Sequence, residues 1–328
     1  MKKYLLPEGG QFYKANLHCH STVSDGRLTP AELKDYYMSM GYAIIAYTDH
    51  DVFVQHHNLT DEHFLALGGF ELCINEKGKD WGHTRTCHFN GIALDPDTYD
   101  HPWYGKEHPF RGICQDRGPD SPHYDPETIS EMMTTVADKG FFVTYNHPVW
   151  SKETHEEYLH YRGMHAMEIE NYGSFVAGYE DYVPYIYDDF LQHGIRLFPV
   201  AADDNHNSLP QDDPRSDAGG GFVMIRAEKL EYRTITAALM RGDFYASEGP
   251  QIHELWVEDG RVHIVASPAA QISMQSDARE FASTRAVGEN PVTEGDFLIP
   301  PTATYIRLTV TDHKGKHANT RAYFTAEF

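Results

Sequence analysis

The residues best suited to chemistry in this sequence are histidines and carboxylates that follow apolar stretches, beginning with the pair His18 and His20. In an extended strand, residues two apart point to the same side, so His18 and His20 can reach one metal ion while Cys19 faces the opposite side. Such a pair is a preformed chelate, but surface strands also carry His-x-His pairs. The prediction of a metal site therefore depends on the rest of the chain.

Further side chains of the metal-binding type recur along the chain. The candidate ligands, in order, are His18, His20, Asp25, His50, Glu71, His88, His147, Asp204 and His206. Neutral imidazoles and carboxylates suit borderline divalent ions such as zinc, manganese and iron, whereas thiolates would favour closed structural zinc sites. Clustered ions lower the pKa of a shared water and clamp the attacking and leaving oxygens of a displacement at phosphorus. We therefore expect hydrolysis by a metal-bound hydroxide, with no side-chain nucleophile.

The elements that must position these residues alternate between strand and helix from Lys14 to Ser247. Apolar periodicity predicts strands over 43–47, 65–72, 86–93, 141–145, 164–170, 195–201 and 222–226. Capping signals, such as Thr29 and Glu32 around Pro30, predict helices over 30–40, 126–139, 181–193 and 232–241. This alternation is typical of a parallel sheet, here long enough to close into a barrel. Barrels build active sites where strands end, and most of the candidate ligands stand there.

The pattern changes after Pro250. Alternating strands are predicted over 252–257, 262–266, 270–274, 305–311 and 321–328, with turn residues between them and no helix. We expect a small antiparallel β-sandwich-like domain over residues 251–328, next to a barrel domain over residues 1–250.

Four motifs in the first 250 residues resemble those of the PHP (polymerase and histidinol phosphatase) superfamily of metal-dependent phosphoesterases. They are His18-Cys19-His20 with Ser24-Asp25-Gly26, Thr48-Asp49-His50, Glu71 followed by His88 and Asn146-His147-Pro148, and Asp204-Asn205-His206. The resemblance implies a distorted barrel of seven strands and helices with two or three divalent ions at its mouth.

The same resemblance implies how the ligands would be shared among the ions. One ion, with its hydroxide, would lie on His18, His20, Glu71 and Asp204; a second on Asp25, His50 and His206; and a third on His88 and His147, with Glu71 bridging.

Alternatives remain at two of the ligand positions. Asp203 is an alternative ligand to Asp204, and His83 is an alternative ligand to His88. Asp49 and Asp51 are interpreted as supporting or turn residues. Glu168 and Glu170 share one face of their strand, which leaves a pocket role open for Glu170 or Asn171. The histidines expected on the surface or in loops are His56, His57, His63, His101, His108, His123, His155, His160, His165 and His193.

The expected substrate is a small phosphorylated metabolite. Candidate phosphate-binding residues, which the sequence does not rank, are Arg85, Lys152, Arg162 and Arg215. A loop-rich insert from Asp95 to Tyr124 is expected to cover the pocket and set specificity. Two alternatives are an amidohydrolase-like metal hydrolase acting on C–N bonds, and a carbohydrate- or protein-binding role of the C-terminal domain with the barrel as scaffold.

The composition, 41% hydrophobic and 23% charged in 328 residues, is that of an ordinary soluble globular protein. The formal net charge of −22 argues against a long nucleic acid as the main ligand, because that binding needs a basic face. A signal peptide and a long apolar run are both missing from the sequence, so we expect a cytoplasmic protein without membrane contact. The four cysteines have no Cys-x-x-Cys spacing, which favours reduced thiols.

Overall fold

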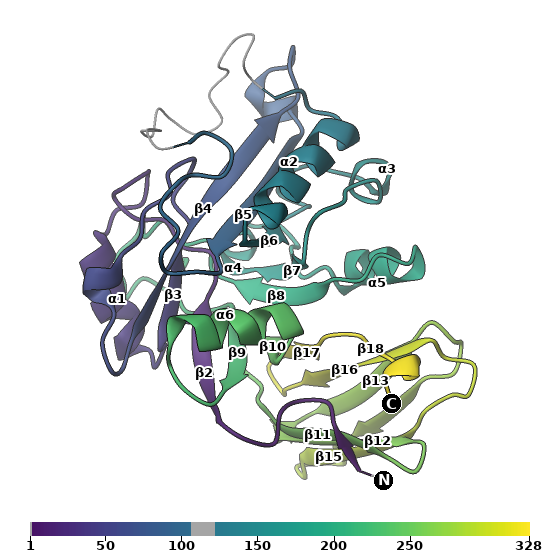
Figure 1. The fold of residues 1–328 in the computed structure, drawn as a ribbon. Coiled ribbons are helices and arrows are strands. Elements are labelled where there is room, and N and C mark those ends of the chain that lie inside the picture. Colours follow the sequence, from purple (N-terminus) through teal and green to yellow (C-terminus); the bar gives the residue numbers. More distant parts are fainter. Residues whose placement is uncertain (1, 106–121) are drawn as a thin grey trace.

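A computed structural model of the chain describes residues 2–105 and 122–328, and shows a mixed α/β fold with a large sheet (Figure 1). The strands of the first part are β1 (Lys3–Tyr4), β2 (Gln11–Asn16), β3 (Ile44–Tyr47), β4 (Leu65–Asn75), β5 (Thr86–Ala93), β6 (Phe141–Tyr145), β7 (Ala166–Asn171) and β8 (Phe198–Ala202). Those of the second part are β9 (Phe222–Ala227), β10 (Phe244–Ser247), β11 (Ile252–Glu258), β12 (Arg261–Ala269), β13 (Gln271–Ser276), β14 (Ala282–Arg285), β15 (Val292–Leu298), β16 (Tyr305–Thr311), β17 (His317–Thr320) and β18 (Tyr323–Phe324).

The helices lie mainly between strands of the first part. They are α1 (Pro30–Ser39), α2 (Pro126–Asp138), α3 (His155–Tyr158), α4 (Tyr172–Val176), α5 (Pro184–Gln192) and α6 (Tyr232–Arg241), with short 3-10 turns η1 (His57–Leu59), η2 (Trp81–His83) and η4 (Thr325–Glu327). The start of α1 follows its capping signal, because the Thr29 side chain accepts from the Glu32 backbone N–H and the Glu32 side chain accepts from the Thr29 N–H. Gly41, with φ of 79°, stands just beyond the end of α1.

The strand pairing of the large sheet does not show the closed barrel expected from the alternation of elements. Its order is β14-β13-β16-β17-β10-β9-β2-β3-β4-β5-β6-β7-β8, so among the described residues the strand pairing is an open path. Strands β2, β3 and β4 are parallel, as are β6, β7 and β8, but β5 is antiparallel to both β4 and β6. Residues 76–85, which join β4 to β5, form a connection too short for a parallel crossover.

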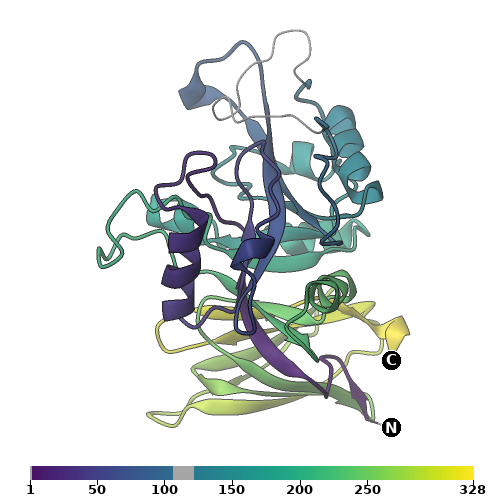
Figure 2. The same cartoon turned by 60° about the vertical axis from the view of Figure 1, so that its left-hand side comes forward.

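The C-terminal strands form two layers around a core that includes Leu255, Ile264 and Leu308. One layer is a four-stranded sheet of order β1-β11-β12-β15, and the other is the end of the large sheet. Figure 2 shows both layers at the end of the molecule where the two termini lie. Two pairings cross the predicted boundary at residue 250, since β1 pairs with β11 and β17 pairs with β10.

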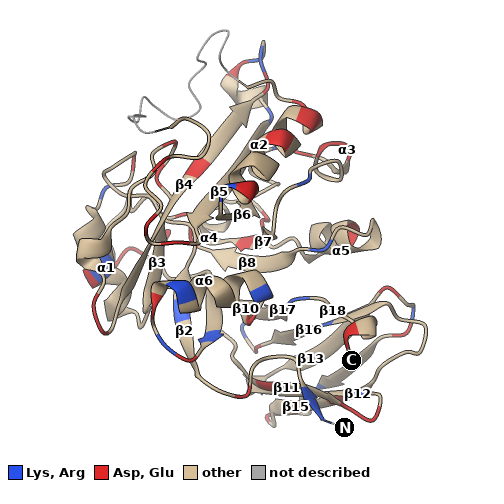
Figure 3. Cartoon of the chain, in the orientation of Figure 1, with Lys and Arg blue, Asp and Glu red and all other residues tan. Residues whose placement is uncertain are grey.

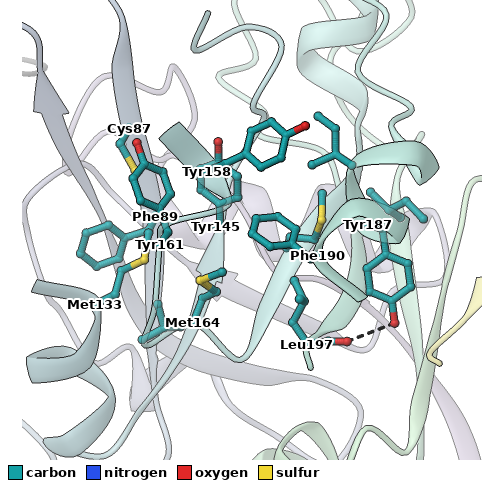
Figure 4. Close-up of a cluster of buried hydrophobic side chains, with 14 of the residues drawn as sticks. Cys87, Phe89, Met133, Tyr145, Tyr158, Tyr161, Met164, Tyr187, Phe190 and Leu197 are labelled. Atoms are coloured by element: carbon teal, nitrogen blue, oxygen red, sulfur yellow. Dashed lines mark hydrogen bonds between the residues drawn. The ribbon is translucent and has the colours of Figure 1, made fainter. Parts of the chain in front are cut away.

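A cluster of buried aromatic and apolar side chains holds the strands β5, β6 and β7 against the helices α2 and α5 (Figure 4). Phe89 of β5, Met133 of α2, Tyr145 of β6 and Phe190 of α5 all belong to it. Burial of each large side chain stabilises the fold by roughly 1.5–3 kcal/mol. Strand β5, which carries His88, and strand β6, which precedes His147, therefore rest on this buried cluster.

Cys19 and Cys87 are free and buried, whereas Cys73 is disulfide-bonded, so the prediction of reduced thiols is wrong for Cys73.

None of the helices within residues 2–105 and 122–328 is both long and apolar enough to cross a lipid bilayer. The predicted insert from Asp95 to Tyr124 lies largely outside the described residues, although Trp103 and Tyr104 pack against the core at its start.

Candidate metal centre

The candidate ligands from the two ends of the first part meet because the segment after β2 lies beside the segment after β8. Cys19 and Asn205 form a parallel bridge. The Asp204 backbone N–H donates to the His18 carbonyl oxygen at 3.0 Å, and the His20 N–H donates to the Asn205 carbonyl oxygen at 3.1 Å. Two ligand pairs that are far apart in sequence therefore share one end of the sheet.

The first group of donor atoms comes from His18, His20, Glu71 and Asp204. The Nε2 atoms of His18 and His20 lie 3.1 Å apart, and Asp204 Oδ1 lies 3.2 Å from the former and 3.1 Å from the latter. Glu71 oxygens approach the same two nitrogens at 3.3 and 3.4 Å. Ligands at ~2.0–2.1 Å from a tetrahedral ion are about 3.3 Å apart, so this spacing suits a single ion.

The second group comes from His20, Asp25, His50 and His206. Asp25 Oδ2 lies 3.4 Å from His206 Nε2 and 3.9 Å from His50 Nε2. This group is wider than the first and is the most accessible part of the cluster, since the side chains of His206 and Asp25 are 29% and 22% exposed. A substrate would reach the cluster from this side.

A third group of donor atoms comes from His50, Glu71 and His88, and His147 approaches the same Glu71 oxygen as His88 does. Glu71 Oε1 lies 3.0 Å from His88 Nδ1 and 3.2 Å from His147 Nε2, while Glu71 Oε2 lies 2.9 Å from His50 Nδ1. The two carboxylate oxygens thus face different imidazoles, which is the geometry of a bridging ligand.

Buried polar atoms without hydrogen-bond partners support the fit of this set to metal ions. Within the described residues, His20 Nδ1, His50 Nδ1 and Glu71 Oε2 are buried and make no hydrogen bond. His50 Nδ1 and Glu71 Oε2 are close, yet their orientation is not that of a hydrogen bond. Buried polar groups are rarely left unpaired, because each costs about 1–3 kcal/mol. Imidazole nitrogens and carboxylate oxygens that converge in this way suit divalent ions.

The electrostatics of the cluster keep its carboxylates ionised. Burial acts to raise the pKa of Glu71, but His18, His88 and His50 outweigh it and hold that pKa well below its usual range. Burial acts to lower the pKa of His20, but its contacts with the carboxylates of Asp204 and Glu71 outweigh burial and raise that pKa to about 10. Bound cations would take the place of such protons.

His88 and His147 differ in protonation. Burial lowers the pKa of His88 to about 4, so its ring is neutral at physiological pH. Burial opposes protonation of His147 too, but its hydrogen bond to Glu71 and the charge of Asp204 raise its pKa to about 9.

Two candidate ligands have an unusual backbone conformation. Asp204 has φ of 52° and His147 has φ of 24°. Residues other than glycine seldom adopt positive φ, and such strain concentrates at functional sites.

The loop after His147 is anchored by Glu153, whose carboxylate accepts from Tyr145 Oη at 2.6 Å and from Tyr124 Oη at 2.8 Å.

Asp203 and Asp204 have separate roles in the structure. The Asp203 carboxylate accepts hydrogen bonds from the backbone N–H groups of Gly219, Gly220 and Gly221 and from the Tyr37 hydroxyl, at 2.7–2.9 Å. It therefore holds the loop before β9. Only Asp204 contributes to the groups of converging donor atoms.

His83, the sequence alternative to His88, lies away from the cluster. Its side chain is 79% exposed and pairs with Asp80, whereas His88 is buried 3.0 Å from Glu71.

The carboxylate of Asp49 accepts from the N–H and hydroxyl groups of Ser21 and Ser24, and so supports the loop that carries Asp25.

Two of the histidines expected on the surface or in loops lie in loops, but their side chains are buried. His56 is 9% exposed and packs on Tyr47, and His101 is 4% exposed and packs on Phe70. Neither belongs to a group of converging donor atoms within the described residues. His108 lies outside the described residues.

The four basic residues predicted to bind phosphate are dispersed. Arg85 pairs with Glu76 and Glu157, and Arg215 pairs with Asp213. The Arg162 guanidinium donates to main-chain carbonyl groups, and the Lys152 amine lies 4.5 Å from the ring of Tyr179. Their role in substrate binding stays a prediction.

Sequence reasoning missed two residues that contact the cluster. Glu168 joins His18 and His147 in a further group of converging donor atoms. Trp150 packs on the rings of His88 and His147, with ring centroids 5.2 and 5.0 Å apart. The signal for Glu168 was its place on one strand face with Glu170, and Trp150 had only its proximity to His147 in sequence.

No family model matches the sequence, and no curated protein matches it either. Among solved structures, the chain is similar to a two-domain protein from Bacteroides vulgatus that contains a predicted PHP-like metal-dependent phosphoesterase. That likeness has 16% identity and a TM-score of 0.49, and covers 98% of each chain.

Two other solved structures are also similar. One is a candidate metal-dependent phosphoesterase from Bifidobacterium adolescentis, with 15% identity and a TM-score of 0.44 over 72% of this chain and 98% of that chain. The other is an amidohydrolase from Chromobacterium violaceum, with 17% identity and a TM-score of 0.38 over 58% of this chain and 87% of that chain.

Proposed function

We propose that this chain is a PHP-type metal-dependent phosphoesterase that hydrolyses a small phosphorylated metabolite. The observation that carries the proposal is the convergence of nine imidazole and carboxylate side chains at one end of the sheet: His18, His20, Asp25, His50, Glu71, His88, His147, Asp204 and His206.

In the proposed mechanism, each side chain has a defined task. His18, His20 and Asp204 would hold one ion, Asp25, His50 and His206 a second, and His88 and His147 a third, with Glu71 shared among them. When bound, such ions activate water for attack at phosphorus and stabilise the charge of the phosphoryl oxygens.

The protein itself supplies geometry and a suitable charge. Glu71, whose two oxygens face different imidazoles, would set the spacing between the ions, and the partly exposed Asp25 and His206 would leave one side open to a substrate. Cys19, the thiol within the first motif, is buried and burial raises its pKa well above the usual range, so it is no candidate nucleophile.

A small substrate fits the charge of the protein. The formal net charge is −22, and Figure 3 shows acidic positions spread over both ends of the molecule. A long polyanion would meet repulsion over most of this surface, whereas a single phosphate group needs positive charge only at the site itself.

We also propose that residues 251–328 support the catalytic part and contribute no metal ligand. Every candidate ligand precedes Asn207 in the sequence. Arg307 pairs with Asp188 of α5 at 2.6 Å, and the Tyr182 hydroxyl donates to Asn319 at 3.2 Å, so this part braces the elements behind the site.

The test combines elemental analysis with a substrate panel. Protein purified without chelator should contain more than one transition-metal equivalent per chain, and should hydrolyse phosphomonoesters or phosphodiesters but not amides. Protein that cannot be reconstituted with manganese, zinc or iron would refute the metal assignment. Activity on amides alone would instead favour an amidohydrolase-like enzyme.

A further inference from the structure

Glu168 is a buried carboxylate that contacts two candidate ligands at once. It lies in β7 and is 1% exposed. Its Oε1 atom lies 2.7 Å from His18 Nδ1. Its Oε2 atom accepts from the His147 backbone N–H at 2.9 Å and from Asn171 Nδ2 at 2.8 Å.

The contact with His18 determines which nitrogen of that ring faces the cluster. A carboxylate only accepts hydrogen bonds, so His18 Nδ1 must carry the hydrogen in this contact. The lone pair of the neutral ring is then on Nε2, the atom 3.2 Å from Asp204 Oδ1. Carboxylates that bind the far nitrogen of a histidine in this way fix its tautomer and orientation and increase its basicity as a ligand.

The contact with His147 acts on the main chain instead. His147 has φ of 24°, which its surroundings must maintain. The bond from its N–H to Glu168 holds this conformation, and the His147 ring then lies with Nε2 3.2 Å from Glu71.

An irregularity in β7 gives Glu168 these surroundings. The register between β7 and β8 shifts between Glu168, opposite Val200, and Glu170, opposite Ala201. Such bulges are frequent beside active sites, where they redirect side chains. Both carboxylate oxygens of Glu170 are buried without a hydrogen-bond partner in the described part of the chain, so the two glutamates have different roles.

We propose that Glu168 is a positioning residue that prepares the first and third metal sites together, by setting the His18 tautomer with one oxygen and the His147 backbone with the other. This inference rests on the proposed metal-dependent function. A direct ligand role is disfavoured by geometry, because Glu168 contacts Nδ1 of His18 and the other donor groups contact Nε2.

The change Glu168→Gln tests this dual role because an amide cannot satisfy both sides. With its oxygen toward His18, the amide NH₂ group would face the donors of His147 and Asn171. With the NH₂ group toward His18, the ring would have to accept at Nδ1 and carry its hydrogen on Nε2, where the ion should bind. Either orientation impairs one site.

The matched control is Glu170→Gln, the same change two residues along the same strand, where no hydrogen bond is lost. Titration of the metal-free proteins with zinc and with manganese, against a competing indicator, should show a 10- to 100-fold loss of affinity for at least one ion in Glu168→Gln. Glu170→Gln should bind as the unchanged protein does.

The outcomes separate this inference from the proposed function. If the unchanged protein binds no metal, the proposed function fails. If it binds metal and Glu168→Gln binds equally well, the role of Glu168 is refuted. Should the variant fail to fold, long-range ¹H–¹⁵N spectra of the zinc-loaded unchanged protein decide instead, because His18 must then show hydrogen on Nδ1 and metal on Nε2. The opposite tautomer would overturn the inference.

Discussion

Asp204→Asn should remove metal-dependent activity while leaving the fold intact. Asp204 has φ of 52°, and asparagine is among the few residues that tolerate this conformation, so the change removes a charge without adding backbone strain. An alanine at this position would remove the charge and strain the backbone at the same time, so the two effects could not be separated.

The expected loss follows from the contacts of the two oxygens. Oδ1 lies 3.2 Å from His18 Nε2 and 3.1 Å from His20 Nε2, and Oδ2 accepts from Asn171 Nδ2 at 3.3 Å. An asparagine that presents its oxygen to the ion would turn its NH₂ group against the NH₂ group of Asn171. We expect turnover to fall more than ~100-fold, beyond the 10- to 100-fold typical of residues that only support a ligand.

Asp203→Asn provides the matched control, since the neighbouring residue is also buried. Each Asp203 oxygen accepts two hydrogen bonds from the set of Gly219, Gly220, Gly221 and Tyr37, and conversion of one oxygen to NH₂ removes the bonds on that side. At ~1.5–3 kcal/mol for a hydrogen bond to a charged group, this variant should lose roughly 3 kcal/mol of stability. Its metal content, measured below the melting temperature, should be retained.

The assay measures metal content, phosphoesterase turnover and urea unfolding for both variants and the unchanged protein. The reasoning requires opposite patterns: metal and activity lost with stability kept for Asp204→Asn, and the reverse for Asp203→Asn. Full metal content and activity in Asp204→Asn would refute the ligand assignment.

Further changes give separate tests. Burial raises the pKa of Glu170 to about 9, so the folded state holds a proton there that the unfolded state releases near pH 4.5. The free energy of unfolding should therefore fall as pH rises between these values, by up to about 1.4 kcal/mol per pH unit. Denaturant unfolding of Glu170→Gln should show a weaker decline with pH. His88→Ala should lower metal content whereas His83→Ala, at a 79% exposed position, should not, and equal elemental analyses would contradict the third site. A chain ended after Pro250 would expose the β10 edge that β17 covers, so it should be largely insoluble by sedimentation, and a soluble monomer would contradict this.

Features that depend on short-range chemistry could be predicted from the sequence. The helix at Pro30 follows from the reciprocal hydrogen bonds of Thr29 and Glu32, which need only local contacts. The strand before His18 and His20 likewise predicts that both rings share a side, and the structure places their Nε2 atoms 3.1 Å apart.

Features set by distant contacts could not be predicted in the same way. The reversed direction of β5 depends on its pairing with β4 and β6, and alternation of strands and helices alone favours a parallel arrangement. The contacts of Glu168 lie at a register shift in β7, which alternation along a regular strand does not reveal. The choice between Asp203 and Asp204 required knowledge of where the loop from Gly219 to Gly221 returns.

The pairing of β1 with β11 has a consequence for how the chain folds during synthesis. Lys3 and Tyr4 are made before the other strands of this fold, yet their partners Val257 and Trp256 are made only after strands β2 to β10. Strand β1 must therefore wait for this partner until strands β2 to β10 have emerged, and its pairing with β11 closes a long loop of the chain. Assembly of the four-stranded sheet is thus a late event, and every candidate metal ligand, up to His206, is made before β1 and β11 can pair.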